Sequence, residues 1–473
     1  MSKLFFYVAF LVSFCGTIFG QFGSSGSTNP VSTGMGNTGN ASSTGIYSIG
    51  INPANLMQSE DKHFEFNSIF PLPEIRVQAG TSFFTFKDLN YYFGGVDGNA
   101  RYLTEKDKQD FKDLFKGGGS IFFDFGYNLL TASYKVSPEI GSFAFSIRDA
   151  GGIDMVIPEA IPDLLFTGSV LNKDYVFNQS KLQSSFMRYY SLSYAREFKE
   201  FQQTFFDKIA AGFTVKLVHG YYYSGADRFE TNLKLSDRAE ITGKADMVLH
   251  SAFSDNFGVK YDFDSTKNLK GSPSLFPSPA GTGLGFDIGF SALYKSNMLF
   301  SIAITDIGTV KWDKNAAEYV ASANIDFNDL TDSKQLDSLS DQLKGKGRYI
   351  SSFTSKLPTA LRLGFAYFLD EQENPIPGRL KVNADFNQGF NNSPGNSVIG
   401  RFSFGAEWKP MDWVPYIRTG FSFGGINKFG WAFGLGFNTK VLQIDIATSD
   451  MGAAFNPNTS KTVSFSCGAR WQF

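Results

Sequence analysis

Apolar and polar residues alternate along many short segments of this chain. In residues 462–473 (TVSFSCGARWQF), one row holds valine, cysteine, alanine and aromatic residues, while the other row is mostly polar. Successive side chains of a β-strand point to opposite faces, so a period of two predicts a strand with one apolar and one polar face. The same alternation recurs in residues 380–386, 400–408, 431–437 and 442–447.

The alternating segments are spaced as hairpins. Six pairs joined by shorter turns are predicted: residues 129–136 with 142–148, 189–195 with 209–218, 284–294 with 299–307, 361–369 with 380–386, 400–408 with 415–423, and 431–437 with 442–447. The connections between the pairs are mostly longer: 149–187, 219–283, 308–359, 387–399 and 448–461. Short turns at one end and long loops at the other are typical of membrane-spanning β-barrels.

The predicted strand number is even, as in single-chain bacterial barrels. Six hairpins supply twelve strands, residues 462–473 add a thirteenth, and residues 63–86, interrupted by two prolines, add a fourteenth. Residues 247–253 also alternate, and we place them in an external loop because counting them would make the number odd. Residues 104–116 predict a helix at the rim, with Thr104 as its N-cap.

Composition favours a membrane barrel over a soluble sandwich, although both alternate. Aromatic residues form 16% of the chain, with 52 Phe and 20 Tyr, yet mean hydropathy is only −0.14. No segment after residue 20 is apolar over the roughly 18 residues that a spanning helix needs. A charge facing lipid costs roughly 2–4 kcal/mol, so the charged row must face the lumen. We therefore predict an all-β fold, a transmembrane antiparallel β-barrel of about 14 strands.

The first 20 residues predict a cleavable signal peptide. Lys3 precedes an apolar run over residues 4–19, which is too short for a comfortable spanning helix. Lipidation at Cys15 is a weaker alternative, because Phe14 stands where lipoprotein signals carry a small residue. Export would leave Cys467 as a single thiol, so an internal disulfide is excluded. The predicted location is the outer membrane, with its lipid as a partner.

A family resemblance appears after the predicted signal peptide. Residues 21–40 are rich in Gly, Ser, Thr and Asn, and Asn52-Pro53-Ala54 follows them. This order resembles the long-chain fatty-acid transporter (FadL) superfamily, in which the N-terminal segment forms a hatch inside the barrel. The resemblance implies a hatch over residues 21–62 and a barrel over residues 63–473. The alternative is an ordinary Asn-Pro turn that enters the first strand.

Three further stretches are similar to outer-membrane barrels. KLPTALRLGFAY at 356–367, with GAEW at 405–408, looks like FadL-like proteins of the Bacteroidota, including the PorV-type barrels of type IX secretion. Trp471 and Phe473 resemble the aromatic end of a closing strand. In such barrels the terminal aromatic residue is an assembly signal, which implies the barrel-assembly machinery as a partner.

The sequence contains no recognisable catalytic constellation. His63, His219 and His250 are widely separated, and no His-x-x-x-His pair occurs. We therefore predict that the protein is not an enzyme and has no cofactor or metal centre. Asp124 and residues 149–154 carry carboxylates that could bind a cation at the rim, or could lie in a solvated loop. A net charge of −2 argues against a nucleic-acid partner.

The charged row of the strands supplies the candidate site residues. The charged side chains predicted to face the lumen are Lys216, Asp287, Arg362, Lys381, Asp385, Arg401, Glu407, Arg418, Asp445 and Arg470. They could form a salt-bridge network that fixes the hatch, or the polar wall of a permeation path. Glycines in the same strands would leave room for a plug or a ligand where they face inward: Gly285, Gly289, Gly405, Gly420, Gly434 and Gly436.

Two functions are compatible with these features. The first is uptake or binding of hydrophobic small molecules by a FadL-like barrel, with Asn52, Pro53 and Ala54 in the hatch at the ligand. The second is a non-enzymatic barrel that holds a partner subunit of a secretion or surface complex, as PorV-type proteins do. The sequence does not choose between them, because a shared fold does not determine the substrate.

Overall fold

The structure is a computed structural model. It describes residues 28–473 except 59–61, 96–98, 100, 168–172, 179, 200–204, 237–239, 259–273, 328–344, 370–375 and 426–427. The predicted signal peptide, and residues 21–27 of the predicted hatch, lie outside the described residues.

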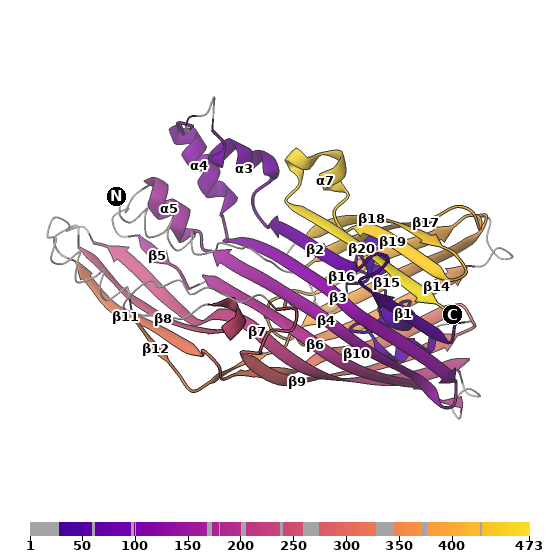
Figure 1. Cartoon of the computed structure of the whole chain (residues 1–473). Helices are drawn as coiled ribbons and strands as arrows, with labels where there is room; N and C mark the ends of the chain where they lie inside the picture. Colours follow the sequence, from indigo (N-terminus) through magenta and orange to yellow (C-terminus); the bar gives the residue numbers. More distant parts are fainter. Residues whose placement is uncertain are drawn as a thin grey trace.

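Fourteen antiparallel strands form a closed barrel (Figure 1). In order around the ring they are β1 (Phe64–Ser68) continued by β2 (Glu74–Thr81), β3 (Gly119–Ser137), β4 (Gly141–Ile157), β6 (Lys181–Glu197), β7 (Lys208–Leu235), β9 (Gly281–Tyr294), β10 (Met298–Trp312), β14 (Ala360–Leu369), β15 (Arg379–Gly389), β16 (Arg401–Lys409), β17 (Tyr416–Gly424), β18 (Phe429–Asn438), β19 (Leu442–Thr448) and β20 (Thr462–Gln472). The ring closes where β20 pairs with β1 and β2. The predicted fold and strand number are confirmed.

The first strand is interrupted between β1 and β2. Residues 69–73 leave the ladder and include Pro71 and Pro73, whose missing N–H groups cannot pair with a neighbouring strand. These residues lie over the outer side of β20: the Leu72 carbonyl accepts from the Ala469 N–H at 3.2 Å, and the Pro73 carbonyl from the Cys467 thiol at 3.8 Å. Cys467 and Ala469 are therefore buried, although they belong to the outward row of β20.

Alternation places apolar side chains outside the barrel and polar side chains inside it. On β16, Phe402 and Phe404 are 55% and 52% exposed, whereas Arg401 and Ser403 are buried. The same division holds on β9, where Phe286 is exposed and its neighbour Asp287 is buried. Aliphatic and aromatic side chains form an apolar belt on the outer face, including Leu192, Phe213, Val215, Ile288, Phe290, Phe300, Ile302, Leu363, Phe421, Leu435, Ile446 and Phe465.

The two ends of the barrel differ. At the end we call the turn end, residues 138–140, 295–297, 410–415 and 439–441 join neighbouring strands. At the opposite end, the loop end, the connections carry α3 (Phe86–Phe93), α4 (Glu105–Leu114), α5 (Ala160–Thr167), α7 (Gly452–Phe455), η4 (Asp255–Phe257) and η5 (Pro457–Thr459). Thr104 caps α4 through a capping box, as predicted. In the described residues, no helix is long and apolar enough to cross a membrane.

Several segments that we predicted to be loops are strands. β7 continues past His219 to Leu235, and with β5 (Asp174–Val176), β8 (Ile241–Phe253), β11 (Ala317–Phe327) and β12 (Lys346–Tyr349) it forms an extension of the barrel sheet at the loop end. We call it the outer sheet; Figure 1 shows it extending beyond the barrel. β13 (Phe353–Lys356) pairs with β10. The segment 247–253 lies outside the barrel, as predicted, but in a sheet rather than a loop.

Near the loop end, the strands are also longer than the sequence predicts. β4 runs to Ile157 and β6 begins at Lys181, whereas we predicted a connection over residues 149–187. The extra strand residues alternate poorly in polarity, because Asp149 and Gly151 interrupt the apolar row. Backbone pairing with β3 and β6 continues through them because these neighbouring strands are equally long.

Residues 28–58 lie inside the barrel, and we call them the inner segment. It contains α2 (Pro30–Gly34), η1 (Gly45–Ser48) and η2 (Pro53–Gln58), and nearly all of it is buried. α2 contacts β17 to β20 on one side of the ring, while η2 contacts β6, β7 and β9 on another. A short segment can touch strands around the whole ring only from within the lumen.

Candidate functional site

The inner segment approaches the barrel wall closely at glycine positions. A Cβ added at Gly420 would overlap the Met35 backbone, and one at Gly212 would lie 2.6 Å from the Pro53 carbonyl carbon. Only glycine permits this approach of one backbone to another. Of the glycines predicted to leave room, Gly289, Gly405 and Gly434 also meet the inner segment, whereas Gly285 meets Leu357 and Gly436 lies under the Arg418–Asp445 pair.

The Asn-Pro-Ala motif is fully enclosed in the lumen. The Asn52 amide nitrogen donates to the Phe290 carbonyl at 3.1 Å, and the Asn52 side-chain oxygen accepts from the Ala54 N–H at 3.0 Å. Pro53 lies against Gly212 of β7. The motif therefore forms a fixed turn that is hydrogen-bonded to the wall strand β9.

A chain of alternating charges crosses the lumen wall from β15 to β19. Glu407 accepts from Lys381 at 2.7 Å and from Arg418 at 2.5 Å, and Arg418 reaches Asp445 at 2.7 Å. Arg418 and Asp445 are almost completely buried. Each charge has an opposite charge within hydrogen-bond distance, which offsets the loss of water.

The same side of the lumen holds the inner segment through Tyr47. Its hydroxyl donates to Asp445 at 3.3 Å, and the Arg470 guanidinium lies over its ring at 4.5 Å. Glu65 of β1 accepts the Ile46 N–H at 3.0 Å and lies 3.6 Å from Arg470. These residues of η1, β1, β19 and β20 join the inner segment to the part of the wall where the barrel closes.

A second charged cluster lies across the lumen on β7, β9 and β10. The Lys216 ammonium contacts Asp287 at 2.7 Å and Asp306 at 2.6 Å, and all three residues are at most 1% exposed. Asp306 sits in a bulge of β10 with φ of +56°. Its backbone N–H donates to Asp287 at 2.7 Å, and this hydrogen bond helps to hold the strained backbone conformation.

The remaining predicted residues lie between these clusters. Asp385 accepts the backbone N–H groups of Gly39 and Asn40 at 2.7 and 2.8 Å, so it binds the inner segment directly. Arg362 donates to Thr305 at 3.1 Å, and Arg401 is buried on the same inner face. Most of the predicted lumen residues thus contact residues 28–58 or one another.

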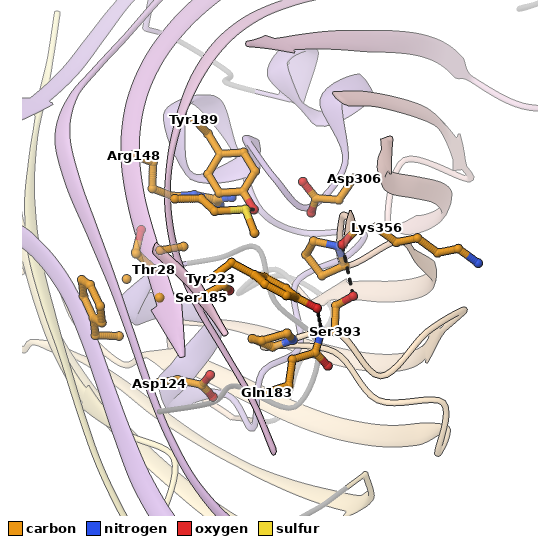
Figure 2. Close-up of a pocket in the computed structure, with 18 residues that line it drawn as sticks. Thr28, Asp124, Arg148, Gln183, Ser185, Tyr189, Tyr223, Asp306, Lys356 and Ser393 are labelled. Carbon is orange, nitrogen blue, oxygen red and sulfur yellow. Dashed lines mark hydrogen bonds between the residues drawn. The ribbon is translucent and has the colours of Figure 1, made fainter. Parts of the chain in front are cut away.

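A cavity of about 50 Å³ lies between the inner segment and the loop end (Figure 2). Thr28 forms part of its floor, and Ser393, Pro394 and Gly395 of the β15–β16 loop cover it. This loop is held across the lumen, since Asn391 and Asn396 donate to the Leu357 and Thr359 carbonyls at 2.8 Å. The cavity therefore lies between Thr28 of the inner segment and the β15–β16 loop.

One wall of the cavity is apolar. Met187, Tyr189 and Tyr223 line it and belong to a larger buried cluster with Val218, Val310, Trp312 and Leu357. A second cavity of about 10 Å³ lies beside Tyr47 and Lys216, and Arg148 lines both cavities. The second cavity has room for about one water molecule.

The carboxylates predicted to lie at a cation-binding rim are separate. Asp149 faces outward and pairs with Arg188 at 2.6 and 2.8 Å, while Asp154 pairs with Lys181. Asp124 faces inward and lines the cavity. All three belong to strands, so the alternative of a solvated loop is wrong. No group of three metal-binding side chains occurs within the described part of the chain.

The three histidines are also apart. His63 precedes β1 at the turn end, His219 lies on the outer face of β7 beside Tyr190, and His250 lies in the outer sheet beside Asp227. None of them lines either cavity.

A model described as a family of unknown function, DUF5723, matches residues 57–449. The chain belongs to the DUF5723 family. The match starts near the end of the inner segment, so it covers most of the barrel but not Asn52-Pro53-Ala54. The comparison with curated proteins found no match.

Solved structures with a similar course of the chain are membrane channels. A TodX monoaromatic hydrocarbon channel mutant has 11% identity and a TM-score of 0.47, covering 96% of this chain and 99% of its own. The toluene transporter TodX of Pseudomonas putida has 12% identity and a TM-score of 0.44, covering 96% and 99%. A FadL homologue of Pseudomonas aeruginosa has 12% identity and a TM-score of 0.43, covering 96% and 100%. The barrel assignment rests on the strand register, not on these similarities.

Sequence reasoning missed much of the cavity of this DUF5723 protein. Arg148, Met187, Tyr189, Tyr223 and Asp306 were not singled out as site residues. One signal for Asp306 is present: the outward apolar positions of β10 are even-numbered up to Ile304 and odd-numbered from Ile307. Such a change of phase marks a β-bulge, which re-aims the side chains that follow it.

Proposed function

We propose that this DUF5723 protein spans the outer membrane and takes up or binds small hydrophobic molecules, with residues 28–58 as a hatch. The apolar belt matches the outward band that a bilayer requires, and the barrel leaves no strand edge unpaired in lipid. The loop end would face the medium and the turn end the periplasm, as is usual for bacterial barrels.

The observation that carries this proposal is the apolar cluster inside the lumen. Water-filled pores have polar interiors. Here Met187, Tyr189, Trp312 and their neighbours occupy the outer half of the lumen and form one wall of the cavity. An apolar wall with few polar groups is the usual lining of a site for a small hydrophobic ligand.

Passage of a ligand through the barrel would require two segments to move, the β15–β16 loop and the inner segment. The cavity of about 50 Å³ is far below the roughly 300 Å³ at which small-molecule pockets begin, so the structure represents a closed state. Residues 390–399 would open toward the medium, and the inner segment would open toward the periplasm. Since binding and passage alone are involved, no residue needs covalent chemistry. No observation favours the alternative of a secretion-complex partner.

A reversible crosslink tests the hatch. A Cβ at Gly34 would lie 3.4 Å from the Cβ of Ala447, close to the 3.5–4.5 Å separation in disulfides. In a Cys467→Ser background, the Gly34→Cys/Ala447→Cys pair should lock α2 to β19. Cells carrying the oxidised pair should take up the fluorescent hydrophobic probe N-phenyl-1-naphthylamine as slowly as cells without the protein, and reductant should restore uptake.

Each single cysteine variant is the matched control, and its uptake should not respond to reductant. Equal uptake by the locked and the reduced double variant would show that the inner segment is not a hatch. Equal uptake by cells with and without the unmodified protein would overturn the uptake proposal itself.

A further inference from the structure

Asp124 is a buried carboxylate without a hydrogen-bond partner. It is 1% exposed, lies on the inner face of β3 and lines the cavity (Figure 2). In the described part of the chain, neither of its side-chain oxygens accepts a hydrogen bond. The acidic residues that the sequence predicts to face the lumen each bind a cationic side chain or a backbone N–H. Asp124 has no such hydrogen bond within the described residues. Burial of a carboxylate without hydrogen bonds costs free energy of folding.

The strands around Asp124 do not supply its missing donors. Asp124 lies opposite Gln78 of β2 and Gly152 of β4. Asp154, on the next inward position of β4, binds Lys181. The Arg76 guanidinium influences Asp124 through its charge, but within the described residues it donates no hydrogen bond to this carboxylate. The open side of the carboxylate is therefore the cavity.

The rest of the cavity lining suits a cation. Asp306, at the opposite side, has one oxygen bound to Lys216 and a second oxygen without a hydrogen bond. Tyr223 presents its aromatic ring between the two carboxylates, and the Tyr189 ring lies beside Arg148 (Figure 2); such rings attract cations. Of the two basic residues in the lining, Lys356 points away from the cavity, and Arg148 stacks over the Tyr189 ring at 5.2 Å.

We propose that this cavity receives the protonated amine of an amphipathic ligand, with Asp124 as its counter-ion. The inference deepens the proposed function and rests on it: the transported molecule has an apolar body and an ammonium head. The head would donate to Asp124, while Met187 and the two tyrosine rings contact the adjoining carbons. The tail would extend under residues 393–395, where the β15–β16 loop covers the cavity.

Binding to the purified protein tests this assignment without a transport assay. Hexylamine, hexanol and hexanoate have the same chain and differ only in the head group. Calorimetric titration should show the amine binding most tightly. Asp124→Asn keeps the side-chain shape and removes the charge, so it should weaken hexylamine about tenfold or more and leave hexanol nearly unchanged. Asp313→Asn, at an exposed position of the loop end, is the control and should bind like the unmodified protein.

Stability separates a binding role from a structural one. If Asp124 serves a ligand, Asp124→Asn should unfold at the same temperature as the unmodified protein or higher, because it removes an unpartnered buried charge. A large loss of stability would assign Asp124 to the fold and overturn the proposal.

Two other outcomes would also overturn it. Equal affinities for hexylamine, hexanol and hexanoate would show that the head group is not recognised. Tight binding of potassium ions that Asp124→Asn abolishes, without amine binding, would assign the carboxylate to an inorganic cation. In either case, reductant-dependent uptake by the Gly34→Cys/Ala447→Cys variant would still support the proposed function, so the two failures are distinguishable.

Discussion

Single residues inside this barrel are satisfied mainly by charge pairs. Arg418 is 1% exposed and contacts both Glu407 and Asp445. Such an arrangement contributes little net stability against an apolar replacement of the whole network, but removal of one member leaves its partners buried and uncompensated. The stability lost on substitution of Arg418 therefore depends on which ion pairs Glu407 and Asp445 lose.

Replacement of Arg418 by methionine should destabilise the barrel by about 3–5 kcal/mol, because Asp445 loses its cation and Glu407 keeps only Lys381. The temperature at which the folded form disappears on unheated gels measures this. Arg379→Met, at an exposed end of β15, is the control and should change stability little. An Arg418→Met barrel as heat-resistant as the control would contradict the inferred role of the pair.

The sequence predicts which of these side chains face the lumen, because the same physical rule applies to every strand. Lipid outside and protein inside impose one rule on every strand, so the polar row of residues 400–408 or 380–386 identifies the lumen. Their partners could not be predicted, since Asp385 bonds to Gly39 and Asn40, more than 300 residues away in the chain. Asp149 breaks the rule: it faces outward, where Arg188 neutralises it and the Leu275 carbonyl accepts from Arg188.

Among the elements, β20 closes the barrel by pairing with β19 on one side and with β1 and β2 on the other. Beyond the end of β20, the Phe473 N–H donates to the Phe64 carbonyl at 2.8 Å, and the Phe473 carbonyl accepts from Phe64 at 3.0 Å. Its ring stacks on Phe64 and Phe66 at 6.4 and 6.3 Å. The final residue thus helps to seal the contact between the last strand and the first.

Replacement of Phe473 by serine should lower the amount of assembled barrel in the outer membrane, because the strand end loses its aromatic contacts and the proposed signal for the assembly machinery. Quantification of the heat-modifiable form in membrane fractions measures this. Phe455→Ser, which changes another exposed phenylalanine, in α7, is the control and should assemble normally. Equal assembly of the two variants would show that the terminal aromatic ring is dispensable.

The elements at the loop end were the least predictable. β7 continues for 28 residues, although its alternation weakens after His219. Its outer half is stabilised by pairing with β8, and β8 is also paired with β11, more than 60 residues farther along the chain. The pairing of β8 with β11 joins segments that are distant in the sequence, and it leaves no local pattern. The sequence alone therefore predicts loops in this region.

At the scale of the whole molecule, the barrel has one orientation in the proposed membrane. An epitope inserted between Asp313 and Lys314, which are exposed at the loop end, should bind antibody on intact cells. An epitope after Asp412, in the β16–β17 turn, should bind only after the cells are permeabilised. The reverse pattern would show that the loop end faces the periplasm, and equal labelling of both sites would contradict a membrane-spanning barrel.

The length of β7 has a mechanical consequence. At roughly 3.3 Å per residue, its 28 residues span about 90 Å, several times the thickness of an apolar belt. The strand that carries Lys216 in the lumen is therefore continuous with the strand that carries the outer sheet. A movement of the outer sheet would therefore act on the same strand whose Lys216 pairs with Asp287 and Asp306. The outer sheet and the charged cluster inside the barrel are thus connected by one continuous strand, β7.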